Sequence, residues 1–332
     1  MAQPASVVIT DVALRDGLQI QPRTVPTDTK LELYERLRAA GVRSVEVGSF
    51  VSPRVVPQMA DADELFRRLP PVDGEAIALV PNLRGAERAL AAGVRHARLL
   101  ISCTEGHSQA NTNRSVDEGL AVVAAVRERL LAEGVHVTGA IATVFVCPFD
   151  GVPPLRQVDR VVGALVRMGL TEISLSDTLG KADPAHVERV VAAMRSSYPD
   201  VAFGLHLHNT YGMGLANLAA GLGQGIEQFD AALGGIGGCP FAPGAAGNIA
   251  TEDVVFMLDS MGVRTGIDLD RLGTAAGFLR TALDGLEAGQ WEVVADPLAA
   301  MVKDSLSGDP RAFYTALASA DATAAGTGTT AR

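Results

Sequence analysis

Two histidines two residues apart, His206 and His208, are the sequence feature with the clearest chemistry. On a strand, alternate side chains point to one face, so both imidazoles are expected to point the same way. With a carboxylate from Asp16 and an amide oxygen from Asn248, they make a mixed nitrogen and oxygen ligand set. Such a set suits Mg²⁺ or Mn²⁺, although Co²⁺, Fe²⁺ and Zn²⁺ also fit it. The alternative is a hydrogen-bonded pair of core histidines.

Charged side chains accompany this predicted metal site. Arg15 stands next to Asp16, and its planar guanidinium suits an enolate or carboxylate oxygen. Glu46 and Asp177 are candidates for orienting their neighbours or for moving a proton. The alternative for Arg15 is a structural ion pair with Glu46 or Asp177.

A glycine-rich stretch, Gly234–Asn248, has six glycines among its fifteen residues and ends where a helix with an acidic first turn is expected to begin. Its composition predicts a loop that closes over a reaction centre. The stretch contains Cys239, which is either an acid/base thiol or a small buried apolar residue. A flexible surface linker is the alternative for the whole stretch.

Short β-rich segments alternate with longer helical patterns along most of the chain. We predict strands at Val7–Val12, Ser44–Val47, Ala76–Val80, Ala97–Ser102, Val137–Phe145, Glu172–Leu175, Phe203–His208 and Gln228–Ala231. Eight strands, each followed by a helix, predict an α/β fold, the (β/α)8 TIM barrel, whose reacting groups lie at the carboxyl ends of the strands. A doubly wound sheet needs a Gly-x-Gly-x-x-Gly phosphate motif after the first strand, and none is found there.

The domain prediction is a single catalytic barrel over residues 1–318. It includes extra C-terminal helices from about 265 to 318, and a disordered tail follows at 319–332, where alanine, threonine and glycine dominate.

Composition excludes several function classes. The chain has 332 residues and a net charge of −10, with no basic run, which argues against a nucleic-acid partner. No apolar run reaches the roughly 18 residues of a membrane span. Three scattered cysteines are too few for a disulfide framework, so a cytoplasmic protein is expected.

At these residues the sequence resembles the 3-hydroxy-3-methylglutaryl-CoA lyase family, a branch of the metal-dependent barrel lyases related to Claisen synthases. The motifs Arg-Asp-Gly-x-Gln and His-x-His mark the wider group, whereas Gly-Gly-Cys-Pro with Gly-Asn-x-Ala-Thr-Glu-Asp is specific to the lyases. The segments that carry the resemblance are Leu14–Gln19, Val45–Met59, Ile173–Gly180, His206–Gly212, Gly235–Pro240 and Gly247–Asp253.

The resemblance implies retro-Claisen cleavage of an acyl-CoA, with acetyl-CoA and acetoacetate as products of the family's usual substrate and leucine degradation as the setting. It implies a metal held by Asp16, His206, His208 and Asn248. The residues it implies for catalysis are Arg15, Cys239, Asp177, Glu46 and His206, and those for substrate binding are Arg15, Gln19, Asn113 and Ser115.

Two loops differ from the usual lyase pattern, Ile20–Arg23 and Gly106–Ser115, and the C-terminal extension lacks the family's cysteine-bearing end. These differences touch the acyl and coenzyme side of the expected pocket. A citramalyl-CoA or a longer 3-alkyl analogue is therefore an alternative substrate. A Claisen-condensing synthase and a catalytically inactive scaffold are the alternative functions, and the extra helices make a homodimer an expectation.

Overall fold

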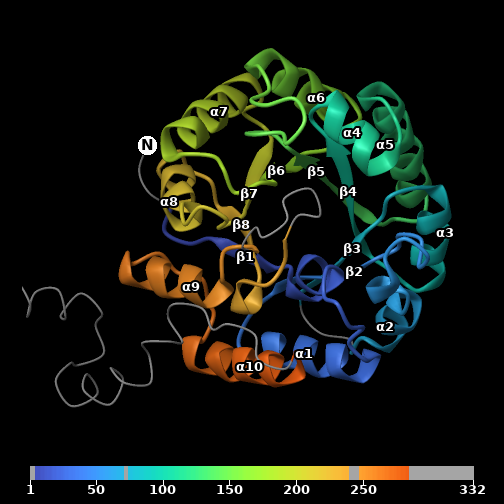
Figure 1. Cartoon of the computed structure of the whole chain (residues 1–332), viewed down its shortest axis with the longest axis vertical. Helices are drawn as coiled ribbons and strands as arrows, with labels where there is room; N and C mark the ends of the chain where they lie inside the picture. Colours follow the sequence, from blue (N-terminus) through green and yellow to red (C-terminus); the bar gives the residue numbers. More distant parts are fainter. Residues whose placement is uncertain (1–3, 71–73, 239–246, 284–332) are drawn as a thin grey trace, which may run out of the picture.

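The structure is a computed structural model that describes residues 4–70, 74–238 and 247–283. Within these residues, eight parallel strands pair in chain order and close into a barrel, with β8 hydrogen-bonded to β1 (Figure 1). This confirms the predicted (β/α)8 fold. The strands are β1 (Val8–Asp11), β2 (Ser44–Ser49), β3 (Glu75–Leu79), β4 (His96–Ser102), β5 (His136–Ala142), β6 (Glu172–Asp177), β7 (Ala202–Leu207) and β8 (Gln228–Ala231).

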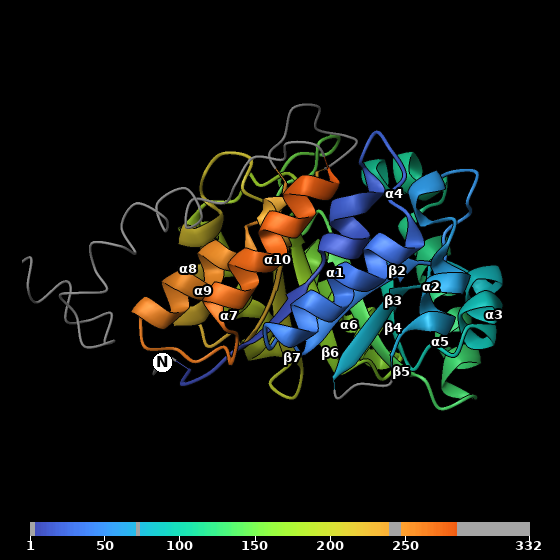
Figure 2. The same ribbon diagram turned by 90° about the horizontal axis from the view of Figure 1, so that it is seen from below.

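Helices surround the barrel on its outside, as seen from the end in Figure 1 and from the side in Figure 2. The described helices are α1 (Thr27–Ala39), α2 (Ala62–Arg68), α3 (Leu83–Ala91), α4 (Glu105–Thr112), α5 (Val116–Leu131), α6 (Leu155–Arg167), α7 (Pro184–Ser197), α8 (Gly214–Gly223), α9 (Thr251–Ser260) and α10 (Leu269–Ala282).

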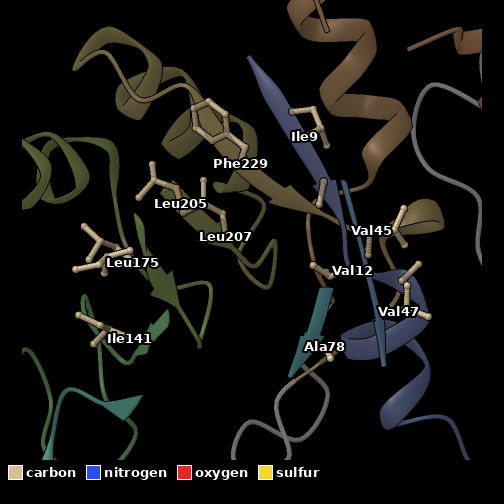
Figure 3. Packing of buried hydrophobic residues seen from close by; sticks show 14 of the residues in the cluster. Ile9, Val12, Val45, Val47, Ala78, Ile141, Leu175, Leu205, Leu207 and Phe229 are labelled. Carbon is tan, nitrogen blue, oxygen red and sulfur yellow. The ribbon is translucent and has the colours of Figure 1, made fainter. Parts of the chain in front are cut away.

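The strands divide their side chains between two environments. Apolar residues such as Leu205 and Leu207 belong to the buried hydrophobic cluster (Figure 3). Because successive side chains of a strand point to opposite faces, His206 lies on the other side, with Arg98 and Asp230. Arg98 on β4 pairs with Asp230 on β8, and these strands are not neighbours in the barrel order. The polar face is therefore the barrel interior.

One predicted strand is too long. The segment expected to extend to Phe145 ends at Ala142, because Thr143 adopts φ 56°, in the left-handed region that a β-branched residue rarely enters. The main-chain amide of Thr143 donates to the hydroxyl of Thr178 at 2.8 Å, which holds this conformation at the mouth of the barrel.

The helix α10 follows the barrel and packs beside α1 (Figures 1 and 2). The amide of Asp268 donates to the carbonyl of Ala40 at 2.7 Å, and the guanidinium of Arg36 lies 4.6 Å from the centre of the Phe278 ring. The predicted extension beyond residue 283 and the predicted tail at 319–332 lie outside the described residues. No helix in the described ranges is long and apolar enough to cross a membrane.

Candidate metal and active site

The turn after β1 places Arg15 and Asp16 at the mouth of the barrel. Residues Ala13–Gly17 form a π-helical turn, η1, in which the amides of Asp16 and Gly17 donate to the carbonyl of Val12. Asp11 anchors the turn, because its carboxylate accepts the amide of Ala13 at 2.9 Å. This carboxyl is fully buried, and burial raises its pKa to about 6.

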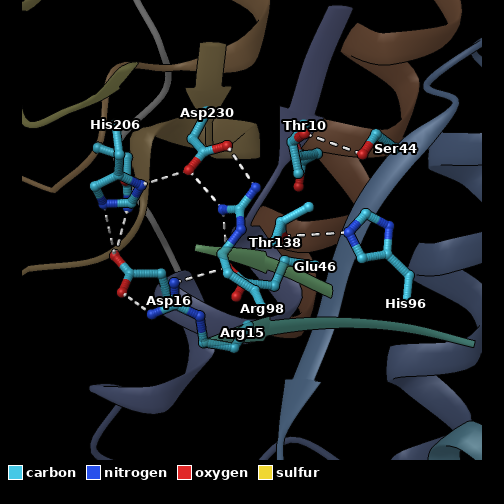
Figure 4. Close-up of polar contacts among 12 residues, drawn as sticks. Thr10, Arg15, Asp16, Ser44, Glu46, His96, Arg98, Thr138, His206 and Asp230 are labelled. Carbon is cyan, nitrogen blue, oxygen red and sulfur yellow. Dashed lines mark hydrogen bonds and ion pairs between the residues drawn. The ribbon is translucent and has the colours of Figure 1, made fainter. Parts of the chain in front are cut away.

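Three predicted metal ligands converge in the barrel. One ligand atom from each of Asp16, His206 and His208 lies within 4.8 Å of the other two. The two Nε2 atoms are 3.2 Å apart, and Asp16 Oδ2 lies 4.0 Å from that of His206 and 3.7 Å from that of His208. Figure 4 shows His206 turned toward the Asp16 carboxylate. The loop after β1 and the end of β7 thus meet in one cluster.

Asn248, which is 232 residues from Asp16 in the sequence, also belongs to this cluster. Its Nδ2 donates to Asp16 Oδ2 at 2.9 Å and to the carbonyl of Ile236 at 3.0 Å. Its Oδ1 is buried and has no hydrogen-bond partner among the described residues. An isolated antiparallel β-bridge joins the main chain at His208 to the main chain at Asn248. An unsatisfied buried oxygen costs about 1–3 kcal/mol, so this amide is suited to a ligand.

The donor set fits a divalent cation. The Nδ1 of His206 lies 3.1 Å from Asp230 Oδ2, so it carries the proton and leaves the Nε2 lone pair free. Adjacent ligands about 2.1 Å from one ion are roughly 3 Å apart, close to the separation of the two imidazole nitrogens. Although burial opposes ionisation, the charge of Arg15 and the neighbouring imidazole of His208 hold the pKa of Asp16 well below its usual range.

Arg15 bridges the cluster to Glu46. Its guanidinium donates to Asp16 Oδ1 at 2.5 Å and to Glu46 Oε2 at 2.7 Å. Gln19 Nε2 donates to the same Asp16 oxygen at 3.1 Å. The ion pair with Glu46, predicted as the structural alternative for Arg15, therefore exists and holds the guanidinium beside the predicted metal ligands.

Two buried charged residues in this network were missing from the sequence-based site, Arg98 and Asp230. The guanidinium of Arg98 donates to both carboxylate oxygens of Asp230, at 2.7 and 3.2 Å. Burial opposes ionisation of Asp230, yet Arg98 and His206 lower its pKa to about 2. The signal that could have revealed both residues is a charge at an alternate position inside a strand predicted to be buried.

Three predicted site residues have local structural partners. Asp177 accepts the amides of Lys181 and Ala182 at 3.1 and 3.0 Å, and burial raises its pKa. Asn113 takes φ 53° at the end of α4, and Ser115 caps α5.

Among the described residues, no hydrogen bond or ion pair joins Asn113 or Ser115 to the Asp16 cluster, whereas Asp177 interacts electrostatically with His208. Cys239 lies outside the described residues.

Comparisons with known proteins agree with this geometry. The HMGL-like family model matches residues 6–279. The chain is 44% identical to (R)-citramalyl-CoA lyase of Chloroflexus aurantiacus, covering 84% of this chain and 91% of that protein. It is 39% identical to hydroxymethylglutaryl-CoA lyase YngG of Bacillus subtilis, covering 84% and 94%. An HMG-CoA lyase of Acinetobacter baumannii, solved with coenzyme A and 3-methylmalate, matches with a TM-score of 0.83 at 39% identity, covering 88% and 95%.

The family match spans the whole described barrel, the solved relative shares its fold, and the two curated relatives are 44% and 39% identical to the chain. The chain therefore belongs to the HMGL-like family of the HMG-CoA lyases and is a carbon–carbon lyase of the retro-Claisen type.

Proposed function

We propose that the protein is a divalent-metal-dependent lyase that cleaves a 3-hydroxy-3-methylglutaryl-CoA-type thioester into acetyl-CoA and acetoacetate. The observation that carries this proposal is the convergence of Asp16, His206 and His208, beside an Asn248 carbonyl that has no hydrogen-bond partner among the described residues. Mg²⁺ or Mn²⁺ is the proposed ion, because the donors mix oxygen and nitrogen.

The chain's own residues can divide the reaction between them. When bound, a divalent cation supplies a Lewis acid that lowers the pKa of a substrate hydroxyl beside it. A base removes the hydroxyl proton and leaves an alkoxide. As the alkoxide becomes a ketone, the C–C bond breaks and its electron pair passes to the thioester fragment as an enolate. Arg15, held by Glu46, is the proposed partner of the enolate oxygen. Protonation of the enolate carbon gives acetyl-CoA, and Cys239 is the proposed residue for proton transfer.

A second candidate substrate is citramalyl-CoA, which has one methylene fewer between the tertiary alcohol and the carboxylate and would yield pyruvate. The 44% identity to a citramalyl-CoA lyase favours it. The same cluster would serve both substrates, because only the distance to the distal carboxylate changes. A hydrophobic site discriminates one methylene by about 1–3 kcal/mol, so activity on both is compatible with one pocket.

The test is to incubate the full chain with either thioester, with Mg²⁺ or Mn²⁺ supplied or chelated, and to measure acetoacetate and pyruvate separately. We expect acetyl-CoA only in the presence of metal, and the second product identifies the substrate. Asp16→Asn should abolish turnover, whereas the exposed Asp200→Asn is the matched control. Full activity of Asp16→Asn, or turnover that chelation does not reduce, contradicts the proposal.

A homodimer and a cytoplasmic location stay predictions. Chromatography with light scattering tests the first, and cell fractionation tests the second.

A further inference from the structure

Arg98 joins two carboxylates from different sides of the barrel. It projects from β4 and is only 8% exposed. Its NH1 and NH2 groups donate to the two oxygens of Asp230 on β8, and NH1 lies 3.8 Å from Glu46 Oε2 on β2. Figure 4 shows the Arg98 guanidinium next to Asp230, with Glu46 nearby. Neither β8 nor β2 is a neighbour of β4, so these contacts cross the interior.

Each carboxylate also holds a residue of the proposed active site. Asp230 Oδ2, which accepts from Arg98, is the same oxygen that accepts from His206 Nδ1. Glu46 Oε2 accepts from Arg15 NH2. Arg98 is thus one contact away from a proposed metal ligand and one contact away from the proposed enolate partner.

We propose that Arg98 is a positioning residue for both. Through Asp230 it fixes the ring orientation and the Nδ1–H tautomer of His206, which leaves Nε2 free as a ligand. Through Glu46 it fixes the direction of Arg15. This inference rests on the metal-dependent function proposed above.

The shape of the contact explains why an arginine serves there. A guanidinium presents several donors in one plane and can hold both oxygens of a carboxylate, whereas a lysine ammonium is a point charge. Without a cation between them, Glu46 and Asp230 would face each other as like charges in a buried interior. Each carboxylate would then turn toward another donor, and the residues that it holds would turn with it.

Arg98 also contacts a cavity on the side away from Asp230. It lines a cavity of about 260 Å³ at the amino-terminal end of the barrel, together with Thr10, Ser44, His96 and Thr138. The guanidinium end of the same side chain reaches Asp230. A short side chain at this position would join the cavity to the site and admit water. The test therefore needs a replacement that keeps the length of the side chain.

The experiment measures Mn²⁺ affinity of the full chain without substrate, by electron paramagnetic resonance, for wild type, Arg98→Met, Arg98→Lys and Asp16→Asn. Because Arg98→Met removes a positive charge near the site, electrostatics alone would tighten cation binding. We expect the opposite, a weakening of about 10–100-fold, because outer contacts of a metal ligand have effects of that size. Arg98→Lys should recover part of the affinity, because its ammonium reaches one carboxylate oxygen.

The outcomes separate this inference from the proposed function. Wild type that binds no Mn²⁺, or Asp16→Asn that binds it as wild type does, overturns both. The positioning role alone is overturned by a different pattern. In that pattern wild type binds Mn²⁺, Asp16→Asn does not, and Arg98→Met binds Mn²⁺ as tightly as wild type or more tightly. If Arg98→Met fails to fold, Arg98→Lys decides: wild-type Mn²⁺ affinity refutes the role, and a loss of several-fold in the folded protein supports it. ¹⁵N-histidine spectra of Arg98→Lys add a second measurement, since loss of the Nδ1–H form of His206 is expected only if Arg98 acts through Asp230.

Discussion

Replacing Glu46 by glutamine tests whether the direction of Arg15 matters for chemistry. Glu46 is fully buried and accepts from Arg15 NH2 at 2.7 Å. Breaking a buried ion pair costs about 3–5 kcal/mol, and a hydrogen bond to a charged group contributes about 1.5–3 kcal/mol. Glutamine keeps the volume and one acceptor oxygen. We therefore expect a loss of about 2–3 kcal/mol in the free energy of unfolding and a fall in Tm of about 3–5 °C.

Glu46→Gln should also slow turnover, with a free-energy cost similar to its effect on stability. Misplacing a group that stabilises developing charge costs about 10²-fold in kcat. KM should change little, because Glu46 is buried beneath the site. Steady-state kinetics and thermal melts of the same preparation supply both quantities. The matched control is Glu172→Gln, on β6, where the carboxylate pairs with a half-exposed His136. A kcat within about threefold of wild type would show that Glu46 stabilises the fold without orienting Arg15.

The remaining predictions concern pH, the loop beside Asn248 and the thiol. Burial lowers the pKa of His96 to about 3, so the unfolded chain takes up a proton near the ordinary value of 6.5 before the folded protein does. Stability should therefore fall by up to about 2 kcal/mol between roughly pH 6.5 and pH 5, and urea titrations of His96→Gln should lack that component. A Cβ at Gly237 would lie 2.4 Å from Asn248 Nδ2, so Gly237→Ala should weaken Mn²⁺ binding about tenfold. Gly262→Ala, also at positive φ but with open space around it, should leave binding unchanged. Cys239→Ala should keep Mn²⁺ binding and slow turnover by about 10²–10⁴-fold, and near-normal turnover removes the thiol from the mechanism.

Local patterns were sufficient to predict the fold and the centre of the site. The eight strands are where alternating and β-branched segments indicated them, because a buried parallel strand needs an apolar face toward the helices. His206 and His208 share a face because they are two residues apart. The helix Glu105–Thr112 was missed, since its glycine, serine and asparagine content is typical of a loop.

The site residues that the sequence did not predict are brought together from distant parts of the chain. Arg98 and Asp230 are 132 residues apart, and only closure of the barrel brings them together. Asn113 and Ser115, which the resemblance implies for substrate binding, lie at the end of α4 and at the start of α5, and their part in binding stays a prediction. Position after a strand indicates that a residue lies near the mouth, but it does not show which way its side chain turns.

The net charge of the ion-paired residues in the barrel interior favours binding of a cation. In the network of ion pairs among the described residues of the site, two guanidiniums, those of Arg15 and Arg98, oppose three carboxylates, those of Asp16, Glu46 and Asp230. One negative charge is left in excess, which favours capture of a cation. A divalent ion reverses the sign to a single positive charge, which favours an anionic substrate and the enolate derived from it. Burying five charges is expensive for a fold, and apolar replacements of such sets are often neutral or stabilising. Under the metal-dependent function proposed above, the arrangement is therefore better explained by the order of binding that it would favour, cation first and thioester second, than by any gain in stability.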